Sequence, residues 1–256
     1  MTKKLLLLAG PTASGKSNLA IKLAKKLNGE IINADSMQVF KEFNILSSRP
    51  SPSQTKKVKH HLYGTISVKK NFSAGDWLKQ AKKKIYNCNK RKKIPIVVGG
   101  TGLYFNAIIK GMSKIPDIDF KTRNMVRELY KRLGFKKFYS HLLKLDPKIK
   151  GRILPTDTQR LQRAYEVKIK TNKSLFDWFE NTKSEFKDFE ISKIFIDTPR
   201  EVLIKKISLR TEQMFKKRCI NEVKKFNSLK ENKSLSVNKL IGVEEINDFL
   251  KKSISL

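Results

Sequence analysis

The feature that most constrains this chain is the run Gly10–Ser17, which matches G-x-x-x-x-G-K-[ST] in full. An apolar segment comes directly before the run, and apolar residues at helical spacing follow it. In that setting, the N–H groups of the Gly-rich turn and of the helix start point at a bound phosphate. Lys16 adds a positive charge, and the Ser17 hydroxyl can ligate Mg²⁺. The run therefore predicts a cradle for a diphosphate or triphosphate, such as that of ATP. Its members are Gly10, Pro11, Thr12, Ala13, Ser14, Gly15, Lys16 and Ser17.

Four short apolar segments predict buried parallel strands, because both faces of such strands are covered. They are Lys4–Ala9, Glu30–Ala34, Ile94–Val98 and Lys193–Ile196. Turn or polar residues follow each segment, often with helical periodicity beyond, and the first helix is expected to end at Asn28–Gly29. The pattern predicts an α/β fold, with a P-loop NTPase-like parallel sheet flanked by helices.

The residue pattern changes between Gly111 and about Glu190, where basic amphipathic segments replace the apolar runs typical of strands. We therefore expect a mainly helical insertion domain over residues 112–190. It would interrupt a P-loop core formed by residues 1–111 and 191–256.

The charge balance favours a polyanionic partner, since 56 Lys and Arg face 23 Asp and Glu, a net charge of +33. An AT-rich genome, which favours lysine, isoleucine and asparagine, would produce a similar excess. Cys88 and Cys219 lie far apart without metal-like spacing, which indicates a reducing compartment and no disulfide framework. No stretch approaches the ~20 apolar residues of a membrane span. We expect a cytoplasmic protein without membrane association, and a monomer.

Two further strand ends carry polar groups that we expect beside the cradle, because ligands collect at the carboxyl ends of parallel strands. Asp35 follows the second strand and could act as a general base or a metal-linked group, or could merely cap a helix. Gly99 and Gly100 follow the third strand and would allow close approach of a ligand. Thr101 adds a hydroxyl there, although a plain turn would look the same.

Arginines mark two helical segments. In the first, Thr156 is expected to cap a helix, with Gln159 completing a capping box and Arg160 and Arg163 sharing one face. That face suits RNA phosphates or an unstacked base, and a solvated surface is the alternative. In the second, Arg210 could fold back onto a diphosphate, or could lie on the surface.

Six segments, in this order, resemble those of tRNA dimethylallyltransferases, the isopentenyl-diphosphate transferase family. They are GPTASGKS, NADSMQVF, HHLYG, VVGGTGLYFNAIIKG, RILPTDTQRLQRAYEV and KLIGVEE, and together they span most of the chain from Lys4 to Glu245. Family members usually continue beyond the last segment into an Arg-rich helix, whereas the present sequence ends at Leu256.

The resemblance implies that Thr12–Ser17 hold dimethylallyl diphosphate, with Mg²⁺ near Ser17. It implies that Asp35 is the general base on the N6 amine of adenine, that Thr101 contributes beside it, and that Arg210 stabilises the departing diphosphate. The implied substrate is adenine 37, in the anticodon stem-loop of tRNAs that read codons beginning with U, and the product is N6-dimethylallyladenosine. The implied tRNA contacts are Asp35, Ser36, Met37, Gln38, Thr101, Arg123, Gln159, Arg160, Leu161, Gln162 and Arg163.

Other classes of protein share parts of this pattern. A P-loop nucleoside or small-molecule kinase would have the same cradle but transfer phosphate from ATP. A prenyltransferase acting on free adenine nucleotides would need no basic helical insertion, and a pure RNA-binding module would need no intact cradle beside Asp35. The segments GGTGLYF and DTQRLQRAYEV favour the tRNA-modifying enzyme over the kinase.

Overall fold

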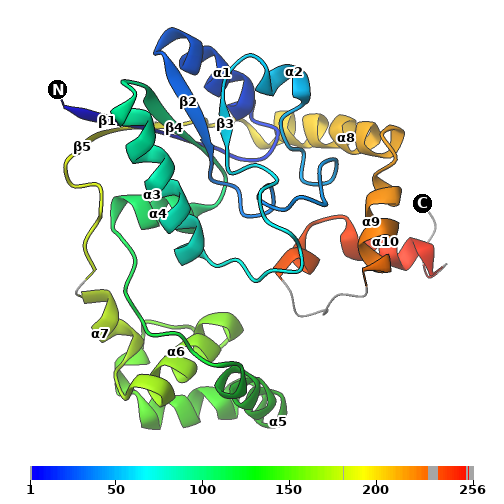
Figure 1. Cartoon of the computed structure of the whole chain (residues 1–256). Coiled ribbons are helices and arrows are strands. Elements are labelled where there is room, and N and C mark those ends of the chain that lie inside the picture. The colour runs from blue at the N-terminus through cyan, green and yellow to red at the C-terminus, as the bar shows by residue number, and fades with distance from the viewer. Residues whose placement is uncertain (1, 181, 230–235, 252, 254–256) are drawn as a thin grey trace. The chain divides into compact units, whose positions relative to one another are not determined.

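The computed structural model describes residues 2–180, 182–229, 236–251 and 253. The chain folds into two compact units (Figure 1). One is built from Met1–Ile108 together with Phe186–Leu256, and the other is Ile109–Glu185. The first unit is therefore discontinuous in sequence, because the second is inserted between two of its strands.

The described residues of the first unit form a five-stranded sheet in the order β3-β2-β4-β1-β5, and every pair of neighbours is parallel. The strands are β1 (Lys3–Ala9), β2 (Gly29–Asn33), β3 (His60–His61), β4 (Ile94–Gly99) and β5 (Phe189–Phe195). The predicted α/β class is confirmed. Four of these strands match the predicted ones, although β5 begins four residues before Lys193. The two residues of β3 are too few to produce a periodic signal.

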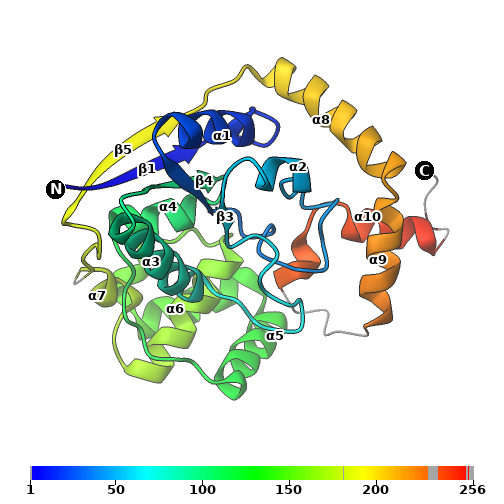
Figure 2. The same cartoon turned by 45° about the horizontal axis from the view of Figure 1, so that its top comes forward.

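Helices cover both faces of the sheet (Figure 2). On one face, α1 (Lys16–Lys26) packs Ala20 and Ala24 against Leu6 and Leu8 of β1. The opposite face is covered by α3 (Ala74–Lys90). Because successive strand residues point to opposite faces, β1 is buried along its whole centre.

The ends of α1 and α3 follow local backbone rules. After α1, Asn28 takes a left-handed backbone with φ of 52°, and Gly29 already begins β2. At the start of α3, Ser73 and Asp76 form a capping box. The remaining helices of the first unit are α2 (Pro52–Thr55), α4 (Gly102–Ile109), α8 (Arg200–Lys216), α9 (Cys219–Ser228) and α10 (Val243–Leu250).

The described part of Ile109–Glu185 contains helices and no strand. Its helices are α5 (Phe120–Leu145), which is broken at Gly134, α6 (Thr158–Thr171) and α7 (Leu175–Glu180). Val126, Phe138 and Leu142 of α5 pack with Leu161 of α6 to form its core.

The start of α6 differs from the prediction. Asp157, rather than Thr156, is the N-cap, and its carboxylate accepts a hydrogen bond of 3.1 Å from the N–H of Arg160. Thr156 lies one residue too early for its hydroxyl to reach the first helical turn. A carboxylate is also a strong cap, because it lies near the positive end of the helix dipole.

The chain enters and leaves this helical unit at adjacent points. A Cβ placed on Gly111 would lie only 2.3 Å from the carbonyl oxygen of Lys183, so the two backbones are in contact there. The hydroxyls of Ser113 and Thr182 are also hydrogen-bonded, at 2.7 Å. Gly111 has φ of 91°, so both its backbone angle and its lack of a side chain are required.

Candidate active site at the carboxyl ends of the strands

The Gly-rich run forms a turn between the end of β1 and the start of α1. Ala13 and Gly15 have left-handed backbones, with φ of 63° and 91°. Gly15 is the N-cap of α1 and makes no side-chain capping bond. The N–H groups at the start of α1 are therefore not used by a capping side chain and remain directed toward the Gly-rich loop. Alternation of right- and left-handed residues turns successive N–H groups to one side, which gives an anion-binding concavity.

Two side chains of the turn also fit an anion. The hydroxyl of Ser14 is buried and has no hydrogen-bond partner among the residues that the structure describes, which is costly unless a ligand supplies an acceptor. Lys16 reaches back over the turn, and its ammonium donates to the carbonyl of Pro11 at 2.6 Å. Burial lowers the pKa of Lys16, so its charge is poorly solvated until an anion arrives. Ser17 is exposed at the open end of the turn.

Asp35 lies in a loop beyond β2 rather than at a helix start, so it caps no helix. Its Oδ1 accepts a hydrogen bond of 2.9 Å from the N–H of Met37. The buried side chain of Asn33 clamps its backbone, accepting from the Asp35 N–H at 2.8 Å and donating to the Asp35 carbonyl at 2.9 Å. Among the described residues, no hydrogen bond occupies Oδ2 of Asp35. The carboxylate is thus fixed in place with one oxygen available.

Thr101 follows β4 and is joined directly to the Asp35 loop. Its hydroxyl accepts a hydrogen bond of 3.0 Å from the N–H of Ser36, and its own N–H donates to the carbonyl of Ala34 at 3.1 Å. A Cβ on Gly99 would lie 2.1 Å from the Ala34 oxygen, so only glycine allows β4 to end this close to the loop. The two strand ends therefore form one continuous rim.

Asp35 is electrostatically coupled to two cations from distant parts of the chain. Burial lowers the pKa of both Lys16 and Arg210, and in each case the Asp35 carboxylate partly opposes that shift. Arg210 also lowers the pKa of Lys16, because one positive charge disfavours another nearby. The sequence predicted these residues separately, and the structure brings them together.

Aromatic residues complete the surroundings of Asp35. Burial, with a smaller contribution from Asp35, raises the pKa of Tyr104 to about 12 and raises that of Tyr63 as well. Tyr104 stacks on Trp77, with ring centroids 4.1 Å apart. Both phenols therefore stay protonated at neutral pH.

Arg210 is oriented by the loop that contains Ser48. The sequence predicts a loop over Ser47–Gln54 but gives no sign of this role. The Nε of Arg210 donates a hydrogen bond of 2.6 Å to the hydroxyl of Ser48. The amide of Gln38 holds the same loop, donating to the carbonyls of Ser47 at 2.9 Å and Ser48 at 3.2 Å. The carboxylate of Glu222 on α9 holds it from the other side.

Glu222 accepts three backbone hydrogen bonds from consecutive residues. The N–H groups of Asn44 and Ile45 donate to its Oε1, both at 2.8 Å, and that of Leu46 donates to its Oε2 at 3.0 Å. Three donors on one carboxylate make a strong, charge-assisted anchor. A single Glu among lysines in NEVKK gives no sequence signal for this role.

The other predicted tRNA contacts belong to the helical unit. Arg160 is exposed and pairs with Asp157 at 2.6 Å, and half-exposed Arg163 pairs with Glu166 at 3.3 Å. Gln159 is exposed as well, and Gln162 is half-buried. The side chain of Leu161 is fully buried in the core, so it supports the helix from inside and presents no surface to a ligand. The Nε of Arg123 is buried and finds no hydrogen-bond partner within the described part of the chain.

The sheet, the Gly-rich turn and the helix that follows define an α/β protein of the P-loop class. A model of the family described as IPP transferase matches residues 38–256. The tRNA dimethylallyltransferase of Pelagibacter ubique (strain HTCC1062) is 56% identical over 253 residues, which cover 99% of this chain and 81% of that protein. The tRNA dimethylallyltransferase of Rickettsia massiliae (strain Mtu5) is 40% identical over 255 residues, covering 99% and 70%. The chain belongs to the IPP transferase family.

Solved structures agree with this assignment. The full-length tRNA isopentenylpyrophosphate transferase of Bacillus halodurans superimposes with a TM-score of 0.66 at 31% identity, covering 99% of this chain and 79% of that one. A eukaryotic dimethylallyltransferase acting on tRNA gives a TM-score of 0.83 at 27% identity, covering 98% and 64%. Among the described residues, no helix combines the length and apolar character needed to cross a bilayer.

Proposed function

We propose that this protein transfers a dimethylallyl group from dimethylallyl diphosphate to N6 of adenine 37 in tRNAs that read codons beginning with U. The products are diphosphate and N6-dimethylallyladenosine. Relatives named tRNA dimethylallyltransferase support the reaction. The observation that carries the proposal is the convergence of Asp35, Lys16 and Arg210 around a cradle that contains the unpartnered hydroxyl of Ser14.

In this reaction Asp35 accepts a proton from the attacking amine. The N6 amine is a weak nucleophile, because its lone pair is delocalised into the purine ring. Its nitrogen forms a bond to the allylic carbon while the carbon–oxygen bond to diphosphate breaks and its electron pair leaves with the oxygen. Oδ2 of Asp35 takes the amine proton, while Oδ1 keeps the hydrogen bond from Met37 that orients the carboxylate.

The leaving diphosphate gains negative charge, and the cradle residues stabilise it in place of water. The N–H groups of the turn, the Ser14 hydroxyl and Lys16 bind its oxygens, and Arg210 approaches from α8 with its guanidinium held by Ser48. Donors fixed before the reaction need no reorganisation as the charge develops.

Mg²⁺ would be held by the exposed hydroxyl of Ser17 together with diphosphate oxygens, since the ion prefers oxygen ligands and readily shares its shell with phosphate and water. When bound, the ion neutralises charge on the diphosphate. The cradle thus offers an oxygen donor of the right kind next to its anion-binding N–H groups.

The tRNA would contact the Asp35–Gln38 loop and Thr101, together with Arg123 and the exposed arginines of α6. An anticodon-loop adenine leaves its stack at lower cost than a duplex base, which suits a base that is read while unpaired. With a net charge of +33, phosphate contacts should make tRNA binding weaken steeply with salt. We place the enzyme in the cytoplasm, acting as a monomer.

The deciding experiment incubates the protein with a substrate tRNA and either dimethylallyl diphosphate or ATP, followed by mass analysis of the nucleosides. Prenylated adenosine is expected only with dimethylallyl diphosphate, and only when the tRNA carries adenine 37. A matched tRNA with guanine at that position serves as control. Phosphate transfer from ATP without any prenylated nucleoside would instead identify a kinase.

A further inference from the structure

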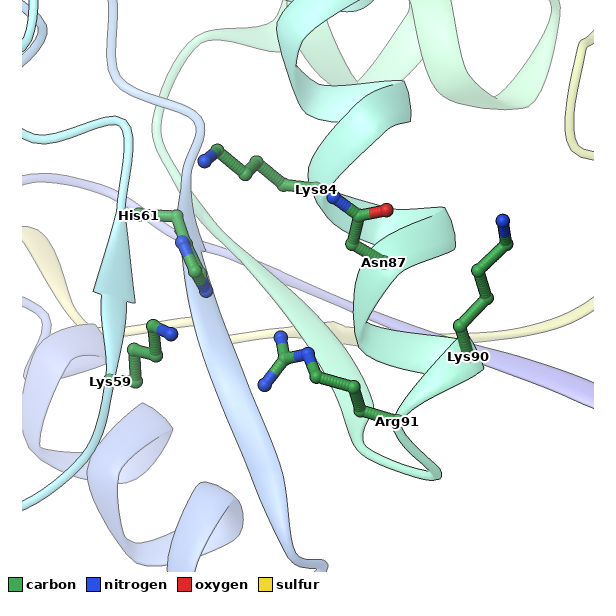
Figure 3. A pocket seen from close by; sticks show the side chains of 6 residues that line it. All are labelled: Lys59, His61, Lys84, Asn87, Lys90 and Arg91. Atoms are coloured by element: carbon green, nitrogen blue, oxygen red, sulfur yellow. The ribbon is translucent and has the colours of Figure 1, made fainter.

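A cavity of about 370 Å³ lies away from the cradle at the edge of the sheet (Figure 3). The cavity is lined on one side by the last turns and the end of α3, and on the other by β3 and the residue before it. The lining residues are Lys84, Asn87, Lys90 and Arg91 from the helix, with His61 of β3 and Lys59 just before that strand. Beneath the cavity lies Glu30, near the start of β2, whereas Asp35 follows the end of that strand. The cavity is therefore at the amino ends of the parallel strands, opposite the rim that carries the candidate active site.

The side chain of Glu30 is held in a fixed position beneath the cavity. It is buried and accepts two hydrogen bonds from the guanidinium of Arg91, at 2.5 and 2.7 Å. The Nε2 of His61 lies 2.7 Å from Glu30 Oε2, and the thiol of Cys88 donates to the same oxygen at 3.4 Å. Arg91 and Glu30 therefore cancel each other's charge and hold each other in place.

The remaining charges of the cavity are all positive. Lys59, Lys84 and Lys90 have no acidic partner among the described residues. Burial lowers the pKa of His61, and Lys84 and Lys59 lower it further, although Glu30 opposes these shifts. Both lysines line the same cavity as His61. Three unbalanced cations around one cavity form an electrostatic site for an anion of several charges.

The same arrangement disfavours a metal ion. Glu30, His61 and Cys88 each present one ligand atom, and these atoms lie within 4.8 Å of one another. However, Arg91 occupies both carboxylate oxygens, and the lysines would repel a cation.

We propose that this cavity binds a small polyphosphate, either inorganic triphosphate or the triphosphate group of a nucleotide. The three ammonium groups match the charge of a triphosphate, and the Asn87 amide and the guanidinium N–H groups of Arg91 not used by Glu30 add directed donors. The volume lies at the small end of ligand pockets. An RNA backbone follows open grooves with one charge per phosphate, which fits a confined cluster of cations less well.

The test separates this cavity from the cradle and from the general positive charge of the protein. Calorimetric titration with inorganic triphosphate is carried out on the Lys16→Ala variant, in which the cradle is weakened. This variant also receives one of two further pairs of substitutions. The first is Lys84→Gln with Lys90→Gln, which line the cavity. The second is Lys79→Gln with Lys83→Gln, two exposed residues of the same helix that do not line it. Both pairs remove the same net charge, so a nonspecific attraction would fall equally in both.

We expect the cavity pair to weaken triphosphate binding about tenfold, with little change for the control pair. Equal weakening by the two pairs would overturn the proposal. Melting temperatures of both variants check that the fold is intact. Introduced into the wild-type chain, with Lys16 present, neither pair should alter prenylation of tRNA, because neither touches the candidate active site.

A second measurement locates the anion directly. The chain contains three histidines, so the ring resonances of His61 can be assigned by substitution of the other two, His60 and His141. Triphosphate should shift the His61 resonances at the concentrations at which calorimetry detects binding, and ATP should do the same if the triphosphate tail of a nucleotide is the recognised group. The proposed site would be refuted if triphosphate left the chemical shifts of His61 unchanged. It would also be refuted if a short oligouridylate changed them more than triphosphate does.

Discussion

Arg210 on α8 donates its Nε hydrogen bond, 2.6 Å long, to the hydroxyl of Ser48, which lies 162 residues earlier in the chain. Ser48 has a left-handed backbone, with φ of 53°, and ends a loop whose three preceding N–H donors converge on Glu222. The direction of the Arg210 guanidinium therefore depends on a carboxylate in another helix. This makes Glu222 a positioning residue for the proposed diphosphate leaving step.

Replacing Glu222 with glutamine should lower kcat about tenfold while the KM for tRNA changes little. Gln keeps the shape but loses one acceptor oxygen and the charge, so the loop and Arg210 shift relative to the diphosphate. Steady-state kinetics with varied tRNA measure both constants. Glu212→Gln on exposed α8 is the control, and the effect should be non-additive with Ser48→Ala, since both act through Arg210. Additive losses would argue against this route.

Asp35→Asn should lower turnover by about 10²–10⁴-fold, because it removes the proposed proton acceptor. The Asn side-chain oxygen can still accept the hydrogen bond from Met37, so the loop and tRNA affinity should be preserved. Single-turnover kinetics and a tRNA filter-binding assay measure the two effects. Wild-type turnover would show that another group takes the proton.

Lys16→Ala should weaken binding of dimethylallyl diphosphate by about tenfold or more, because it removes a partly buried cation that faces the cradle. Calorimetry with the donor, in the presence and absence of Mg²⁺, gives the affinity. Lys22→Ala, an exposed position on the same helix, should leave it unchanged. Equal affinity for the donor in wild type and Lys16→Ala would place the diphosphate elsewhere.

Ser14→Ala should have opposite effects on the free and the bound protein. Without ligand, the substitution removes a buried hydroxyl that lacks a partner, so the free energy of unfolding should stay the same or rise by about 1 kcal/mol. With the donor bound, it removes a hydrogen bond, so affinity should fall. Urea unfolding and donor titration test both parts. A destabilised free protein would mean that this hydroxyl has a partner within the fold.

Glu30→Gln should lower the free energy of unfolding by about 1–3 kcal/mol at pH 7, because it weakens the bidentate bond to Arg91. Arg91 lowers the pKa of Glu30 from its ordinary 4.5 to about 2. A lowered carboxyl pKa stabilises the fold fully above pH 4.5, and the contribution is lost as pH falls toward 2. Urea unfolding at pH 7 and pH 3 should therefore show a smaller difference between wild type and Glu30→Gln at pH 3. Exposed Glu128→Gln is the control.

Much of the fold follows from patterns in the sequence. The apolar segments before Gly10 and Asp35 predicted two central strands, because parallel strands buried on both faces read as unbroken hydrophobic runs. The cradle and Asp35 could be predicted from strand ends and spacing. The short β3 could not, since two residues carry no periodicity.

The parts of the site that escaped prediction depend on contacts between distant segments. Ser48 and Glu222 have ordinary neighbours in sequence, and their roles arise only when α8 and α9 approach the loop before α2. The buried phenols of Tyr63 and Tyr104 lay inside segments already noted for their resemblance, but burial next to Asp35 cannot be read from residue type. The cap of α6 moved from Thr156 to Asp157, because both are good capping residues and only the backbone path selects one.

The contact between Gly111 and Lys183 has a consequence for how this chain can be cut and rejoined. Since the two ends of the helical unit already touch, a few small residues would bridge them without stretching either flank. The helical unit is thus inserted through two adjacent chain crossings. It could be excised or exchanged while β4 and β5 still pair with β1.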